Sequence, residues 1–168
     1  MKLDTKDSST SGANSGVNKL TTIVAIYDVS SVQRLVDAAR IVYGMGYQTF
    51  VAVKVYGAAT QNGIPEVAKM AIREKKSFHV LASLDDLIEL FEPEKLVIIS
   101  REYGEPVNRE ELVKIISGNK LVILVGGSET SITRKEASKA TTIYPSFIPG
   151  YIGPLGELAI ILYLASSK

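Results

Sequence analysis

The sequence contains no cysteine, no tryptophan and only one histidine, His79. A chain without cysteine forms no disulfide and has no thiolate that could act as a nucleophile or a metal ligand. His79 lies in an apolar, strand-like run (FHVLA), where a histidine is more often structural than a metal ligand. We therefore expect no metal site in this protein.

Long apolar runs and an excess of one charge are also missing. The longest strongly apolar run, residues 158–165, is much shorter than a membrane span, which needs roughly 18 residues. The N-terminus lacks the apolar core of a signal peptide, so we expect a cytoplasmic protein. Because the formal net charge is only +1, a nucleic-acid partner would need positive patches pooled in a dimer or supplied by a partner protein.

Two common nucleotide-binding motifs are absent. A dinucleotide fingerprint would place G-x-G-x-x-G directly after the first strand, whereas this chain continues with Asp28, Val29 and Ser30. No glycine-lysine-serine/threonine triplet follows a strand, so the chain has no Walker loop. Both absences weaken an interpretation as a nicotinamide enzyme or a nucleoside triphosphatase.

A regular alternation of strand and helix patterns is present. Residues 1–19 are polar and rich in serine and glycine, so we expect a disordered tail before a single domain of residues 20–168. Capping patterns at Ser30, Ser83 and Asn108 indicate helix starts. Short apolar runs predict strands at residues 22–27, 49–55, 78–81, 96–99, 121–125 and 141–145, and a last apolar helix at residues 158–165.

This alternation predicts an α/β fold, Rossmann-like, with a mostly parallel sheet that is covered by helices on both faces. Ligands of such sheets bind in the crevice at the carboxyl ends of the strands. The expected lips of that crevice are Ser100 with Arg101, residues 126–129, and residues 148–156. Glycines in the last two segments let the backbone approach a ligand closely.

Three stretches of the chain resemble a known family. The run LVGGSE at residues 124–129 resembles the glycine/glutamate loop of the SpoU–TrmD (SPOUT) class of RNA methyltransferases. The run IPG at residues 148–150, with LG at residues 155–156, resembles the last motif of that class. Arg40 stands six residues before Gly46, as the arginine of the first motif in SpoU-type members does.

The resemblance covers roughly residues 22–167 and implies a C-terminal trefoil knot, bound S-adenosylmethionine, an RNA substrate (rRNA or tRNA) and a homodimer. It implies catalytic roles for Arg40 and Glu129. Because the last helix is apolar around its circumference, we expect a partner chain to cover its outer face, with a contribution from Leu35 and Ala39. The residues expected to bind the cofactor are Ser100, Val125, Gly126, Gly127, Ser128, Ile148, Gly150, Ile152, Gly153, Leu155 and Gly156.

Several residues depart from the family pattern. Arg34 stands where the family usually has asparagine, and Thr-Ser at residues 130–131 replaces flexible glycine. Pro-Leu-Gly at residues 154–156 replaces serine-leucine-asparagine and so removes a hydroxyl and an amide. Glu157 is expected to cap the last helix from its first turn. These departures leave the methylated atom undetermined.

The leading functional interpretation is an S-adenosylmethionine-dependent RNA methyltransferase. The alternative is a non-catalytic module that keeps the same fold and binds a nucleotide, RNA or another protein. A nuclease or other metal-dependent enzyme ranks third, because only four carboxylates lie near strand ends: Asp28, Glu102, Glu105 and Glu129.

Overall fold

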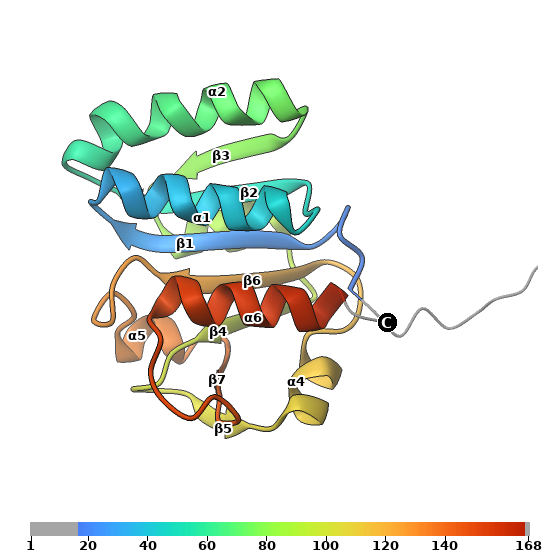
Figure 1. The fold of residues 1–168 in the computed structure, drawn as a ribbon. Helices are drawn as coiled ribbons and strands as arrows, with labels where there is room; N and C mark the ends of the chain where they lie inside the picture. Colours follow the sequence, from blue (N-terminus) through green and yellow to red (C-terminus); the bar gives the residue numbers. More distant parts are fainter. Residues whose placement is uncertain (1–16, 167–168) are drawn as a thin grey trace, which may run out of the picture.

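The structure, a computed structural model, describes residues 17–166 and contains one seven-stranded sheet (Figure 1). The strands are β1 (Ile23–Val29), β2 (Thr49–Val55), β3 (Ser77–Leu81), β4 (Lys95–Ile99), β5 (Glu105–Val107), β6 (Leu121–Gly126) and β7 (Thr141–Pro145). The helices are α1 (Val32–Gly44), α2 (Ile64–Glu74), α3 (Leu84–Phe91), α4 (Arg109–Ile115), α5 (Arg134–Ala137) and α6 (Pro154–Ser166), with a π-helical turn η1 (Ala59–Gly63) before α2.

The strands pair in parallel, in the order β3-β2-β1-β6-β4-β7-β5. β6, which comes late in the chain, therefore lies between β1 and β4. Tyr27 of β1 pairs with Gly126, and Ile99 of β4 pairs with Val125. The carboxyl ends of these three strands consequently meet at one edge of the sheet, where ligands of parallel sheets bind.

Helices cover both faces of the sheet, which confirms the predicted fold class. One core lies between the sheet and helices α1, α2, α4 and α6, and a second core lies under α3 and α5. The strands are apolar on both sides because each side faces a core. In β2, for example, Phe50 enters the first core and Val51 enters the second. Figure 1 shows α1 and α6 side by side over the first face.

Two local expectations need correction, and two short elements were not predicted. α1 is capped by Ser31 and not by Ser30, since the Ser31 Oγ accepts a hydrogen bond from the Arg34 amide at 3.2 Å. β5 and α5, of three and four residues, are too short to leave a periodic pattern. The last helix begins at Pro154, because proline suits a first helical turn, so residues 154–156 are helical and not part of a loop.

The N-terminal expectations fall mainly outside the described residues. The predicted tail spans residues 1–19, whereas the structure describes the chain from Val17 onwards. Val17 itself forms an isolated parallel bridge with Gly118. Within residues 17–166, none of the helices is long and apolar enough to cross a lipid bilayer. The C-terminal knot stays a prediction.

Tyr47 anchors α6 to the rest of the fold, and a conservative substitution tests this. Its side chain is fully buried, and its hydroxyl donates a hydrogen bond to the Leu162 carbonyl of α6 at 3.3 Å. Tyr47→Phe should lower the free energy of unfolding by about 1 kcal/mol, because a buried hydrogen bond is lost while the ring stays. Urea denaturation measures the change. Tyr56→Phe, at a tyrosine that is 48% exposed, is the control, and equal midpoints for both variants would contradict the anchoring role.

Candidate functional site

A pocket of about 260 Å³ opens at the carboxyl ends of β4 and β6. The first turn of α6 and the segment before it close the opposite side. Its lining combines apolar, hydroxyl and charged side chains with glycine backbone. The residues that line it are Ile99, Ser100, Arg101, Glu102, Gly126, Ser128, Glu129, Thr130, Ile132, Tyr151, Pro154 and Glu157.

The turn after β6 is held against β1 by a close backbone approach. The Gly127 amide donates a hydrogen bond to the Tyr27 carbonyl at 2.7 Å. A Cβ atom on Gly127 would lie 2.4 Å from the Asp28 carbonyl oxygen and 2.9 Å from the Val29 Cα. Only glycine fits this position, so Gly127 fixes the turn from behind and does not open onto the pocket.

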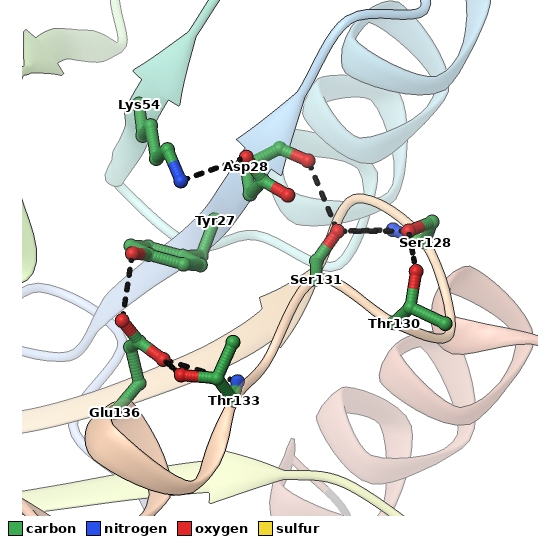
Figure 2. A network of polar contacts seen from close by, with 8 residues as sticks. All are labelled: Tyr27, Asp28, Lys54, Ser128, Thr130, Ser131, Thr133 and Glu136. Atoms are coloured by element: carbon green, nitrogen blue, oxygen red, sulfur yellow. Dashed lines mark hydrogen bonds and ion pairs between the residues drawn. The ribbon is translucent and has the colours of Figure 1, made fainter.

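Hydroxyl groups hold the same turn in shape (Figure 2). The Ser131 side chain is buried, and its Oγ donates to the Asp28 carbonyl at 3.1 Å and accepts from the Ser128 amide at 2.9 Å. The Thr130 and Ser128 hydroxyls lie 3.4 Å apart. The Thr-Ser pair that departs from the glycine pattern therefore supplies internal hydrogen bonds, which keep the pocket wall rigid.

Beside this turn, the ends of β1 and β2 carry a polar cluster (Figure 2). Asp28 and Lys54 both have left-handed backbones, with φ of 62° and 55°, and their side chains form an ion pair at 3.3 Å. The Tyr27 hydroxyl donates to Glu136 Oε1 at 3.0 Å. Burial, followed by this bond to Glu136, raises the pKa of Tyr27 to about 12. The cluster supports the β1–β6 edge from the face opposite α6.

A buried ion pair closes the α6 side of the pocket. Glu157 is 2% exposed, and its Oε1 accepts a hydrogen bond from Arg101 Nε at 2.5 Å. The Arg101 guanidinium lies 5.2 Å from the Tyr144 ring centre and 5.6 Å from that of Tyr151, within cation–π range. Glu157 lies in the first turn of α6, as expected, and its carboxylate is the buried partner of Arg101.

The structure gathers some of the predicted site residues and separates others. Ser100, Gly126, Ser128 and Glu129 line the pocket. A second pocket of about 340 Å³ contains Ile152, Gly153, Leu155 and Gly156. The remaining predicted residues line neither pocket: Val125 is in the core, Gly127 lies against β1, and Ile148, Gly150 and Arg40 stand outside.

Sequence reasoning placed Arg101 and Tyr151 at the expected edge of the crevice without giving them a role, and it placed neither Glu157 nor Arg34 in a pocket. Arg101, Tyr151 and Glu157 line the first pocket, and Arg34 lines the second. Arg101 follows a strand end, which was a usable signal, whereas its pairing with Glu157 depends on the fold. Arg34 Nη1 donates to the Gly127 carbonyl at 2.5 Å, a contact that joins residues far apart in the sequence.

Comparison with known proteins gives the family. The profile of the DUF2122 family, described as RecB-family nuclease, matches residues 57–164. A protein named "Putative type II restriction enzyme ApeKORF2002P", from Aeropyrum pernix, is 36% identical over 84% of this chain and 90% of its own length. "Putative type II restriction enzyme MjaORF1200P", from Methanocaldococcus jannaschii, is 34% identical over 86% of this chain and 96% of its own length.

Solved structures with a similar fold carry different names. A "probable methylase family protein" from Haemophilus influenzae Rd KW20 superposes with a TM-score of 0.69 at 16% identity, over 89% of this chain and 66% of its own. The SpoU methyltransferase AviRb from Streptomyces viridochromogenes, in complex with the cofactor AdoMet, superposes with a TM-score of 0.66 at 10% identity. The match covers 88% of this chain and 57% of AviRb. This chain therefore has a divergent SPOUT-like fold.

These findings correct the functional prediction. The sequence predicts an RNA methyltransferase, whereas the family profile and both relatives carry nuclease or restriction-enzyme names. The methyltransferase prediction is therefore wrong. The error has a physical origin, because glycine turns at strand ends specify a fold and a pocket, while the reaction depends on side chains that differ between proteins of one fold.

The close approach of Gly127 generates a stability prediction. Gly127→Ala should lower the free energy of unfolding by about 1–3 kcal/mol, because the methyl group collides with the end of β1. Gly150→Ala is the matched control, since a Cβ there meets no atom within 4 Å. Thermal unfolding followed by circular dichroism compares the two. A loss of stability that is no larger for Gly127→Ala than for Gly150→Ala would contradict the packing role.

Proposed function

This chain belongs to the DUF2122 family of RecB-family nucleases, and on that premise we propose that it hydrolyses nucleic acid while S-adenosylmethionine occupies its strand-end pocket. The single observation that carries the site is the pocket between β4, β6 and α6, where glycine backbone, hydroxyls and carboxylates converge. Such a concave site with few polar groups suits a small ligand.

The pocket lining supports an adenosyl ligand. Ile99 and Ile132 offer an apolar surface for a purine ring, and Ser100 and Ser128 offer hydroxyls to its polar edges. Gly126 allows the ligand to approach the backbone. The complex of AviRb with AdoMet supports this choice among adenosyl compounds, since both chains share one fold.

Glu129 is the proposed general base. It is exposed at the rim of the pocket, where a bound nucleic acid could reach it. Its carboxylate would take a proton from the water molecule that attacks the phosphorus atom, and the leaving oxygen would be protonated by solvent. Arg40, the second predicted catalytic residue, takes a supporting role because it forms an ion pair with Asp37 at 3.1 Å, away from this pocket.

The proposed hydrolysis contains no metal step. Many nucleases use two metal ions, which need several clustered carboxylates. Across the part of the chain that the structure describes, no group of three or more His, Cys, Asp and Glu side chains could hold an ion. Glu157 lines the same pocket as Glu102 and Glu129 but already forms an ion pair with Arg101. The residues present therefore do not fit a metal centre.

One pair of assays tests ligand and reaction separately. We expect calorimetric titration to give micromolar affinity for S-adenosylmethionine, and Thr130→Trp, which fills the pocket from an exposed position, to weaken it at least tenfold. We expect the full chain to cut plasmid DNA or a structured RNA, and Glu129→Gln to slow cutting by about 10²–10⁴-fold.

The outcomes separate the two halves of the proposal. Glu129→Gln should bind S-adenosylmethionine as the native chain does, which shows that the variant is folded. Intact plasmid and RNA after prolonged incubation, with and without S-adenosylmethionine, would refute hydrolysis. Absence of binding heat with S-adenosylmethionine would refute the proposal that this compound occupies the pocket.

We also propose that two copies pair through the outer face of α6. Tyr163 on that face is 62% exposed, although the helix is strongly apolar. Leu35 and Ala39 take no part, because both are fully buried within their own chain. Light scattering should give twice the mass of one chain, and Tyr163→Glu should shift the mass toward one chain. A native chain that stays monomeric at micromolar concentrations would rule this out.

A further inference from the structure

The second pocket lies between the start of α1 and the start of α6. Its polar lining comes from Ser31, Gln33, Arg34 and Asp37 on the α1 side, and residues 152–156 form the opposite wall. Pro154 lines this pocket and also the first one, so the two pockets are neighbours across a single residue. Its volume of about 340 Å³ can hold a phosphate group with the attached sugar.

Arg34 is the cation of this pocket. Its half-buried side chain donates one hydrogen bond, from Nη1 to the Gly127 carbonyl, and within residues 17–166 the guanidinium makes no other. A guanidinium carries five N–H donors in a planar fork. The bond to Gly127 fixes the fork in place, and donors remain that can bind an anion in the pocket.

The one carboxylate in the pocket is already neutralised. Asp37 Oδ1 lies 3.1 Å from Arg40 Nη1 and accepts a hydrogen bond from Gln33 Nε2 at 2.8 Å. With Asp37 paired to Arg40, the positive charge of Arg34 is left uncompensated in the pocket. Arg40 thereby acts as a positioning residue, because it removes the charge that would repel an anion.

We propose that this second pocket binds a backbone phosphate of the nucleic-acid partner, with Arg34 as its main ligand. The proposal rests on the proposed function, and it names the residues that hold the substrate next to Glu129. The phosphate would bind to the free donors of Arg34 and to the Ser31 hydroxyl. The first pocket, which shares Pro154 with the second, would then face the same nucleic-acid strand.

Arg34 also joins the two pockets mechanically. Its partner Gly127 lies between Gly126 and Ser128, which both line the first pocket. A phosphate that binds the guanidinium therefore also acts on the Gly127 carbonyl, which belongs to the turn that forms the wall of the first pocket. Whatever factor the nucleic acid applies to the affinity for the small ligand, the small ligand applies to the affinity for the nucleic acid, as linkage requires.

Fluorescence anisotropy with short fluorescein-labelled DNA and RNA oligonucleotides tests the proposal on the full chain. Arg34→Ala should weaken binding at least tenfold and reduce the slope of log affinity against log salt by about one. Arg34→Lys keeps the charge and should recover part of the loss. Arg40→Ala should weaken binding less than Arg34→Ala does. Arg73→Ala is the control, because Arg73 is an exposed arginine on α2 that lines neither pocket.

Several results would overturn the assignment. If Arg34→Ala lowers the melting temperature but keeps the oligonucleotide affinity and the salt slope of the native chain, Arg34 has a purely structural role. Inorganic phosphate should compete with the oligonucleotide in the native chain and lose this effect in Arg34→Ala; equal competition in both would also overturn it. A native chain that binds oligonucleotide through Arg34 without cutting it would refute the hydrolysis and leave this inference standing.

Discussion

The contact between the ends of β1 and β6 supports the whole candidate site. Gly127 sits against Asp28 and Val29 so closely that no side chain fits between them. This contact sets the path of residues 128–131, whose hydroxyls form the pocket wall, and it presents the Gly127 carbonyl to Arg34. Both pockets therefore depend on one backbone approach, which is why a glycine is needed there and not merely tolerated.

The second constraint is the burial of Glu157 beneath Arg101. A carboxylate that is 2% exposed is costly unless it is paired, and the pairing ties the start of α6 to the end of β4. The rings of Tyr144 and Tyr151 both lie within cation–π range of the same guanidinium, so Arg101 also holds the segment before α6. The pocket is thus closed by charge and aromatic contacts on one side and by hydrogen-bonded backbone on the other.

The fold could be read from the sequence because its signals are local. Alternating apolar runs and capping boxes, such as those at Ser83 and Asn108, mark elements independently of their neighbours. The site was predicted only in part, because Arg34, Arg101 and Glu157 acquire their roles from partners far along the chain. Glycine motifs indicated the strand ends beside which the structure has a pocket, yet such motifs are shared by proteins of one fold and different chemistry, so they misled about the reaction.

The position of β6 has a consequence for how the chain reaches this state. β6 fills the middle of the sheet, pairing residue 27 with residue 126, although it is synthesised after five other strands. Without β6, the edge of β1 opposite β2 has no strand to pair with. Such late, long-range closure slows folding and leaves a strand edge open to other chains. The edge of the sheet that carries the candidate site therefore cannot form before β6 is available, however early β1, β2 and β3 pair.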